Sequence, residues 1–337
     1  MKTSIIITTI FYPTEAVRSF AKLVKEDLDL IVIGDQKTPG DWQLPPARFF
    51  SYSDQVKLGY KIAGRLPIDH YCRKMIGYLY AFSEGADIIV DTDDDNIPYP
   101  NWVFPSFSGQ YPVTENDGGF TNVYAYYTRQ KIWPRGFPLR RINDSKKIEK
   151  MIDLQQKPVE IGIWQGLADE DPDVDAIYRL IINEPCNFEK NGDLVLGQNT
   201  VCPFNSQNTA FRKEVFPLLY LPATVTFRFT DILRGIIAQP VLWKAGYHLG
   251  FTNPTVYQKR NDHDYLKDFE SEIPFYLKIE EIYDLAKSTA SESRSISDNL
   301  FAIYRSLEKE KIVTGDELTL LEFWLADFQK YSYGPNY

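Results

Sequence analysis

Cysteine, histidine and methionine are scarce in this chain: each occurs three times in 337 residues. The cysteines Cys72, Cys186 and Cys202 are widely spaced and make neither a disulfide framework nor a metal knuckle. Disulfide-dependent proteins are typical of oxidising compartments. We therefore expect a protein of a reducing compartment, with a cytoplasmic location.

Long apolar runs and an excess of positive charge are also missing. No stretch approaches the ~18 apolar residues of a membrane-spanning helix. The N-terminal apolar run is short, is interrupted by threonine and lacks a small-residue cleavage site, so we expect a first strand at residues 3–10 instead of a signal peptide. The net charge of −9 disfavours a protein whose main task is to bind nucleic-acid phosphates, although a local basic groove is compatible with it.

Two glycine-rich phosphate-binding motifs are absent as well. The sequence contains neither GxGxxG nor GxxxxGK[ST], so a dinucleotide-binding or ATP-hydrolysing Rossmann protein loses its usual support. What remains is an α/β nucleotide site that holds phosphate through a metal ion.

The chain has ample material for a core, since 44% of its residues are hydrophobic. Residues 3–10 read as a buried strand, and a helix follows from Pro13 to about Leu28. A second strand is expected at residues 30–33. This β-α-β beginning predicts a doubly wound α/β sheet.

A cluster of carboxylates follows the short apolar strand expected at residues 86–90. Like charges at this density repel one another unless a cation or hydrogen-bond donors compensate them. Oxygen ligands suit Mg²⁺, Mn²⁺ or Ca²⁺, and ligands bind beyond the carboxyl ends of strands in open α/β sheets. The alternative is a solvated acidic turn. The cluster comprises Asp91, Asp93, Asp94 and Asp95.

Two further candidates precede this cluster. Asp35 directly follows the second strand, where it can meet a nucleotide base or ribose or simply form a turn. A helix is expected from Asp69, as its N-cap, to Glu84. Arg73 and Lys74 lie off the apolar stripe of that helix, so they either reach a diphosphate or form a solvated basic face.

The middle of the chain combines a predicted loop (97–118), a strand (120–127) and a proline-rich segment (133–143). Arginines in a rigid loop suit anion binding, and a partner or nucleic-acid surface is the alternative. The three arginines of this segment are Arg135, Arg140 and Arg141.

Asp231 opens an apolar helix expected at 227–243, with Thr230 as its cap, and Pro240 is expected to kink or shorten it. A carboxylate there could serve as a catalytic base or stabilise the helix dipole. His263 lies between two aspartates and could complete a metal site or be structural.

The remainder of the chain reads as helices, ending in an amphipathic helix at 316–331 that could pack on the first domain or mediate a dimer. We therefore predict a catalytic domain at 1–265 and a helical extension at 266–337.

Several segments together resemble a known family. The resemblance extends from about residue 3 to residue 275, in the same order, and points to the STELLO glycosyltransferase-like proteins. In looser form it extends to the reversibly glycosylated polypeptides, which include UDP-arabinopyranose mutases. It implies a GT-A-type, Rossmann-like nucleotide-diphospho-sugar transferase fold with a metal bound through a DxD motif. The segments are IIVDTDDDN, WQGLADEDPDVDAIYRL, CPFNSQNTAF, TDILRGIIAQPVLW and VYQKRNDHDYLKDF.

The resemblance also implies roles for the acidic motif and for residues before it. It assigns Asp93 to the ribose, Asp95 to the metal and Asp94 to a place beside them. Asp35 and Lys37 resemble a nucleoside-contacting turn. Arg73 falls where the mutase-like proteins carry an arginine.

In the second half of the chain, RGFPLR resembles a mutase segment that bears a self-glycosylated arginine, with Arg135 and Arg140 as the candidates. Asp231 falls on an aspartate that opens a helix in both families.

We therefore expect a metal-dependent glycosyltransferase that uses a nucleotide sugar, in particular a UDP-sugar, with Mn²⁺ or Mg²⁺. Asp93, Asp95 and His263 would hold the metal, Asp231 would act as a general base or position the acceptor, and arginines would offset phosphate charge. The alternatives are a UDP-sugar mutase and a non-catalytic nucleotide-sugar-binding or assembly protein. The sequence does not identify the acceptor, although a nucleic-acid acceptor is disfavoured. A homo-oligomer is compatible with the sequence.

Overall fold

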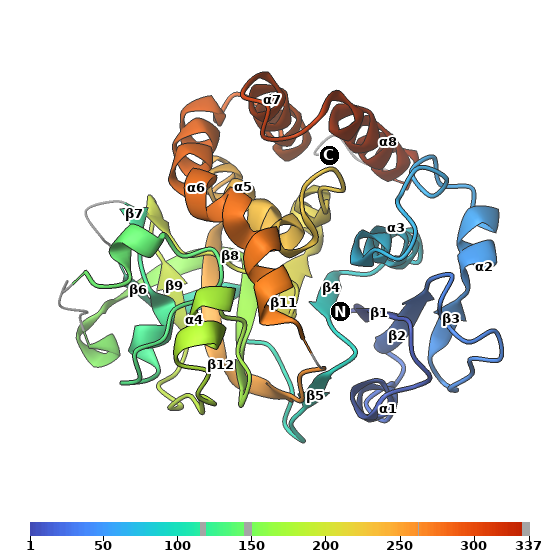
Figure 1. Ribbon diagram of the computed structural model, residues 1–337, viewed down its shortest axis with the longest axis horizontal. Helices are drawn as coiled ribbons and strands as arrows, with labels where there is room; N and C mark the ends of the chain where they lie inside the picture. Colours follow the sequence, from blue (N-terminus) through green and yellow to red (C-terminus); the bar gives the residue numbers. More distant parts are fainter. Residues whose placement is uncertain (115–118, 145–149, 262, 332–337) are drawn as a thin grey trace.

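The computed structural model describes residues 1–114, 119–144, 150–261 and 263–331, and these form a mixed α/β structure (Figure 1). Its centre is a ten-stranded sheet in the order β3-β2-β1-β4-β11-β8-β6-β9-β12-β5, with β8 also paired to β12. The strands in that order are β3 (Arg48–Phe50), β2 (Leu28–Gly34), β1 (Thr3–Thr9), β4 (Ile88–Thr92), β11 (Asn208–Arg212), β8 (Gln155–Asp169), β6 (Ser108–Thr114), β9 (Leu194–Leu196), β12 (His248–Gln258) and β5 (Asn96–Pro98). A separate pair joins β7 (Gly119–Phe120) to β10 (Thr200–Val201).

The N-terminal half of the sheet is parallel and doubly wound, as predicted. Strand β1 pairs in parallel with β2 on one side and with β4 on the other, and β3 extends the sheet beyond β2. The chain therefore reverses its direction of winding between β1 and β4, which is where ligands bind in open α/β sheets. Strand β11 then runs antiparallel to both β4 and β8, and this makes the sheet mixed.

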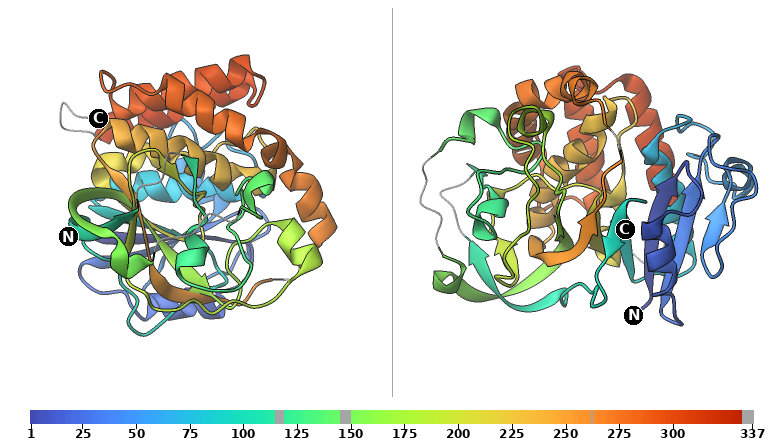
Figure 2. Two further views of the ribbon diagram at one scale, coloured as in Figure 1. Left: turned by 90° about the vertical axis from the view of Figure 1, so that its left-hand side faces the viewer. Right: turned by 60° about the horizontal axis from the view of Figure 1, so that its bottom comes forward.

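The long strand β8 holds the second half of the sheet together. Its first part, up to Glu160, pairs antiparallel with β6, and its part from Ile161 to Asp169 pairs in parallel with β12. Figure 2 shows the blue N-terminal strands at one end of the molecule and the green strands of this second half at the other.

Side-chain alternation along β1 and β2 produces one core on each face of the sheet, because successive residues of a strand point to opposite faces. Ile6 and Ile31 join a cluster that includes helices α3 and α5–α8. Ile5 and Leu30 join a second cluster that includes α1. The helices are α1 (Glu15–Ala21), α2 (Tyr52–Lys57), α3 (Lys74–Ser83), α4 (Ala176–Ile181), α5 (Thr230–Lys244), α6 (Tyr265–Thr289), α7 (Ile296–Lys309) and α8 (Gly315–Tyr331).

The C-terminal helices follow the prediction closely. Helix α6 packs on α4 and α5, α7 packs on α5 and α6, and α8 packs on α7 and α3 (Figure 1). Their buried side chains, among them Phe275 and Trp324, belong to the same cluster as Met75 of α3. The helical extension thus shares the core of the sheet region, and the domain boundary at residue 265 stays a prediction. Among the described residues, no helix combines the length and apolar character needed to cross a bilayer.

Several expected elements differ from those in the structure. The expected strand at 120–127 is the short β7 followed by a 3-10 turn, η2 (Val123–Tyr126), and the expected loop at 97–118 contains β6. Segment 202–216, which is polar in its first part, supplies the central strand β11. Hydrogen bonding to β4 and β8 overrides local composition there.

The helices also differ in their ends. Helix α1 begins at Glu15, with Thr14 as its cap, and ends at Ala21. Asp69 does not cap a helix: His70 caps the 3-10 turn η1 (Tyr71–Arg73), which leads into α3. Helix α5 continues through Pro240 to Lys244 instead of ending there.

Candidate functional site

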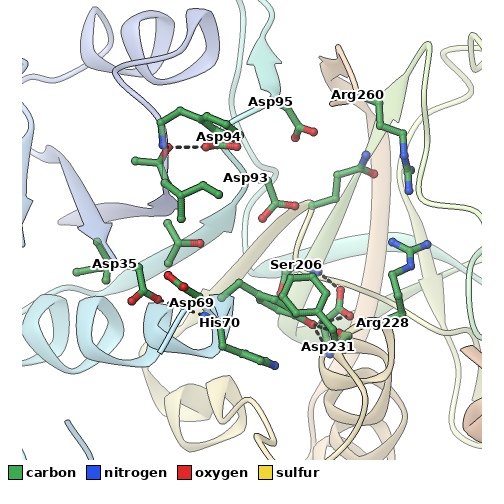
Figure 3. A pocket seen from close by; sticks show the side chains of 18 of the residues that line it. Asp35, Asp69, His70, Asp93, Asp94, Asp95, Ser206, Arg228, Asp231 and Arg260 are labelled. Atoms are coloured by element: carbon green, nitrogen blue, oxygen red, sulfur yellow. Dashed lines mark hydrogen bonds between the residues drawn. The ribbon is translucent and has the colours of Figure 1, made fainter. Parts of the chain in front are cut away.

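A cavity of ≈ 290 Å³ opens at the carboxyl ends of β1, β2 and β4, where the winding of the sheet reverses (Figure 3). Its walls come from both halves of the chain, so residues more than 200 positions apart in the sequence line one space. The lining residues are Thr8, Thr9, Ile10, Phe11, Ile33, Gly34, Asp35, Asp69, His70, Tyr71, Asp93, Asp94, Asp95, Arg135, Asp173, Ser206, Gln207, Phe227, Arg228, Asp231, Gln258, Arg260 and His263.

The first aspartate of the acidic cluster is structural. Asp91 is fully buried and accepts hydrogen bonds from Lys74 Nζ at 2.9 Å and from Arg234 Nη1 at 2.8 Å. Lys74 is also fully buried, so the expectation that it reaches a diphosphate is wrong: it binds Asp91 and Asp93 inside the protein. This network ties the end of β4 to α3 and α5.

The other three aspartates line the cavity. Lys74 Nζ lies 2.5 Å from Asp93 Oδ1, Thr9 Oγ1 donates to Asp94 Oδ2 at 2.5 Å, and Gln258 Nε2 donates to Asp95 Oδ2 at 3.0 Å. Burial raises the pKa of all three carboxyls, and repulsion from neighbouring aspartates raises it further. The pKa of Asp94 reaches about 6. The cluster is therefore short of positive charge.

The donor set fits a hard divalent cation that is also bound by a ligand. Asp95 Oδ1 is buried without a hydrogen-bond partner, and a cation would satisfy it. A bound cation would also favour the charged form of the Asp93 and Asp95 carboxyls. Within the described ranges, no group of three or more His, Cys, Asp or Glu residues converges as a complete metal site. Mg²⁺ commonly uses one or two carboxylates and takes its other ligands from phosphate and water.

His263 lines the cavity. Its Nδ1 is 3.0 Å from Asp268 Oδ2. A carboxylate on one ring nitrogen orients the imidazole and leaves the other nitrogen for a ligand, as around metal-bound histidines. Its role as a metal ligand stays a prediction.

Asp35 and Lys37 flank the end of the cavity formed by β2. Asp35 lines it and accepts hydrogen bonds from the backbone N–H groups of Gln36 and His70, at 2.8 and 3.2 Å. Lys37 is exposed and pairs with Asp69, a lining residue, at 3.0 Å. Asp35 is thus held in place at this end of the cavity, and Lys37 lies outside the lining.

Arg73 does not lie at the cavity, so the expectation that it contacts a diphosphate is corrected. Its guanidinium is buried, donates to Gln55 Oε1 at 2.9 Å and stacks 4.6 Å from the centre of the Tyr52 ring. The turn η1 that precedes α3 directs this side chain towards α2. Arg140 is likewise corrected: it is exposed and is not a lining residue.

Asp231 and Arg135 lie together at the cavity floor, although the sequence separates them by 96 positions. Arg135 donates to Asp231 Oδ1 at 3.0 Å and to Oδ2 at 2.8 Å, and its Nε donates to Asp173 Oδ1 at 2.8 Å. Tyr71 Oη and the Ser206 N–H also donate to Asp231, each at 3.1 Å. A close approach of α5 makes this possible, since a Cβ on Gly235 would lie 2.2 Å from the carbonyl oxygen of Phe204.

This pairing makes Asp231 a weak base. Burial acts to raise its pKa, but the charge and hydrogen bonds of Arg135, aided by Arg234 and Arg228, outweigh burial and lower the pKa to about 2. A general base works best when its pKa lies near the operating pH. Of the two expected roles, positioning therefore fits the geometry better than proton abstraction.

Several lining residues carried no individual role in the sequence prediction, namely Tyr71, Asp173, Ser206, Gln258, Arg228 and Arg260. Ser206 lies in CPFNSQNTAF and Asp173 in WQGLADEDPDVDAIYRL, and both segments belong to the family resemblance. Residues 169–175 bind structural partners: Asp173 binds Arg135, and Asp175 caps α4 and accepts from Trp133 Nε1 at 2.7 Å.

The fold and the site together describe an α/β protein with an acidic cavity at the switch point of its sheet. Along almost its whole length the chain is similar to two proteins of Arabidopsis thaliana. It is 28% identical to the probable glycosyltransferase STELLO1 and 26% identical to the probable glycosyltransferase STELLO2, in each case over 98% of this chain.

The alignments cover 44% and 45% of these relatives, so the chain spans less than half of their length. Residues 228–335 match the family described as STELLO glycosyltransferases. The resemblance to STELLO proteins predicted from the sequence is confirmed.

Two crystal structures of glucosyl-3-phosphoglycerate synthase from Mycobacterium tuberculosis show a loose likeness. One contains Mn²⁺, UDP and glucosyl-3-phosphoglycerate, with 10% identity and a TM-score of 0.37. The other contains Mg²⁺ and UDP, with 11% identity and a TM-score of 0.35. Each comparison covers 82% of this chain and 79% of the other. TM-scores of this size are too low to transfer details of the site.

Proposed function

We propose that this chain is a GT-A-type glycosyltransferase that binds a nucleotide-diphosphate sugar, in particular a UDP-sugar, together with Mn²⁺ or Mg²⁺. The supporting observation is the composition of the cavity. The carboxylates at the end of β4 have too little positive charge around them, and the far wall carries Asp231 and several arginines. The similarity to the two STELLO proteins supports the same class of reaction. A cytoplasmic location and a homo-oligomeric state also stay predictions.

In this proposal Asp35 contacts the nucleoside and Asp94 fixes the loop beside it through Thr9. Asp93 and Asp95 hold the metal ion, which when bound neutralises charge on the leaving diphosphate. His263 would have to move to join them, since no three such side chains converge among the described residues. Asp93 is also within reach of a ribose in the same cavity. Asp231, held by Arg135, orients the acceptor.

The mutase alternative is less well supported. It requires a sugar to be attached to an arginine, and all three guanidinium nitrogens of Arg135 donate hydrogen bonds, to Asp173, Asp231 and the carbonyl of Arg228. A nucleophilic nitrogen would have to leave this network. Arg140, the other candidate, is exposed and is not a lining residue.

The test is release of UDP from a panel of UDP-sugars with Mn²⁺, with products analysed by mass spectrometry. We expect turnover by the wild-type chain and a loss of at least about 100-fold for Asp95→Asn, because the variant removes an anionic metal ligand. Asp284→Asn, an exposed change on α6, is the matched control.

Full turnover by Asp95→Asn, or in EDTA, would contradict the metal-dependent mechanism. Ring-form conversion without an acceptor would indicate the mutase, and nucleotide binding without any product would indicate a binding protein.

A further inference from the structure

Arg260 has a largely buried side chain with an unpaired hydrogen-bond donor among the described residues. It follows the end of β12 by two residues, lines the cavity, and its side chain is only 7% exposed. Its Nε is buried without a hydrogen-bond partner. Among the described residues its contact with an acidic group is long, since 3.7 Å separates its Nη2 from Asp268 Oδ2. A guanidinium carries five N–H donors, and leaving them unsatisfied in a buried position is costly.

Asp268 is poorly placed to compensate this charge because it has other partners. The same Oδ2 atom lies 3.0 Å from His263 Nδ1, and Oδ1 lies 4.0 Å from Arg228 Nε. Burial lowers the pKa of Arg260, and repulsion from Arg228 and Arg179 lowers it further. The charge of Arg260 is therefore incompletely balanced by the protein.

Arg228 provides a second cation at the same wall. Its guanidinium binds Glu272 Oε1, with Nη2 at 2.7 Å, and is 11% exposed. Figure 3 shows the guanidinium groups of Arg228 and Arg260 facing one another, on the side of the cavity away from Asp35. The nearby carboxylates Asp173 and Asp171 favour the charge of Arg260, but their direct ion pairs are with Arg135 and Arg179.

We propose that Arg260, assisted by Arg228, forms a subsite for an anionic group, a phosphate or a carboxylate, of the sugar acceptor. Two facing guanidinium groups suit oxyanions, which accept several charge-assisted hydrogen bonds at once. This inference rests on the proposed function and adds the chemical class of the acceptor to it.

We assign the anionic group to the acceptor and not to the donor because of where the side chains lie along the cavity. Asp35 marks the nucleoside end, and the carboxylates Asp93 and Asp95 mark the metal and diphosphate. The two arginines lie on the side of the cavity away from Asp35 (Figure 3). Arg228 acts on the charge of Asp231, the group assigned to the acceptor, and Arg260 acts on the charge of Asp95. The β-phosphate of the donor is the competing source of the same chemistry.

The test is calorimetric titration of the full chain with methyl phosphate and, separately, with acetate, at constant ionic strength, with and without saturating UDP and Mg²⁺. We expect at least one anion to bind, and to bind as well or better when UDP and Mg²⁺ are present. Arg260→Gln should weaken this binding about tenfold or more and leave UDP binding unchanged. Arg305→Gln, an exposed arginine of α7, should leave both unchanged.

Displacement of the anion by UDP and Mg²⁺ would assign the arginines to the donor diphosphate and overturn the proposal. No anion binding, or equal binding by Arg260→Gln and wild type, would overturn it as well. The competition measurement uses the wild-type chain, so it holds even if the variant does not fold. Failure of UDP itself to bind would count against the proposed function instead.

Discussion

At the scale of single residues, the floor of the cavity is organised by buried charges that neutralise one another. Asp231 and Arg135 are each almost fully buried, and each has further partners. Buried pairs of this kind contribute little net stability as a unit, but removing one member leaves the other charge uncompensated. The effect of removing either charge can therefore be measured on the free energy of unfolding and, separately, on activity.

Asp231→Asn should lower the free energy of unfolding by about 3 kcal/mol, since Arg135 then loses one of its two anionic partners. The urea midpoint measures this. In a double-mutant cycle with Arg135→Gln, the two losses should sum to more than the loss of the double variant. Additive losses would contradict the coupling that we infer from the geometry.

His70 gives a prediction for pH. Burial lowers its pKa from 6.5 to about 4, against an opposing effect of Asp35. Its neutral Nδ1 accepts from the Cys72 N–H at 3.1 Å, which protonation would prevent. A group whose pKa is lower in the folded state stabilises the fold above its unfolded pKa. That stability is lost as the pH falls from about 6.5 towards 4.

The loss from His70 should reach about 2 kcal/mol at pH 5. His70→Asn keeps an N-cap acceptor and removes the titration. Urea unfolding at pH 7.5 and pH 5.0 should show a smaller loss of stability in the variant than in wild type. Equal losses would show that His70 does not titrate in this range.

At the scale of secondary structure, the position of α5 depends on a close contact of its backbone. Gly235 faces the backbone of Phe204, and this approach brings Asp231 to the N–H of Ser206. Alanine is the better helix former, by about 1 kcal/mol. Steric contact with a carbonyl oxygen should nevertheless determine the outcome here.

We therefore expect Gly235→Ala to destabilise the chain by about 1–3 kcal/mol, as measured by urea unfolding, because the backbone of Phe204 has to move. Gly315→Ala is the matched control: it lies at the start of α8, and nothing lies within 4 Å of its added Cβ. It should be neutral or slightly stabilising. A neutral Gly235→Ala would mean that α5 can shift at no cost.

At the scale of the whole molecule, the site joins the two halves of the sheet. The carboxylates that follow β4 belong to the N-terminal half, and Asp231, Gln258 and Arg260 belong to the C-terminal half. A ligand that contacts both halves binds the folded state alone and stabilises it by mass action.

UDP with Mg²⁺ should therefore raise the melting temperature, and UDP in EDTA should raise it much less. At a ligand concentration 100 times Kd, the stabilisation should be about 2.7 kcal/mol. Thermal denaturation of wild type and Asp95→Asn measures it, and the variant should lose most of the metal-dependent part. Equal shifts with and without metal would remove the role assigned to Asp93 and Asp95.

The sequence by itself determined the order of the first strands, the helical C-terminus and the acidic turn after β4. Apolar periodicity, helix-capping residues and turn residues act within a few positions of one another, so these features can be predicted from short stretches of sequence. The positions of Asp35 and of the aspartates after β4 are also predictable from neighbouring residues, since each comes directly after a strand of the parallel part of the sheet.

Only the tertiary structure decided which charges reach the cavity. Arg73, Lys74 and Arg140 carry the same charge as Arg135 and Arg260, yet the first two are buried against other partners and the third is exposed outside the cavity lining. The pairing of strand β11 with β4 and of Asp231 with Arg135 joins segments 96 or more residues apart. Such contacts are set by packing and long-range hydrogen bonds, which local patterns do not encode.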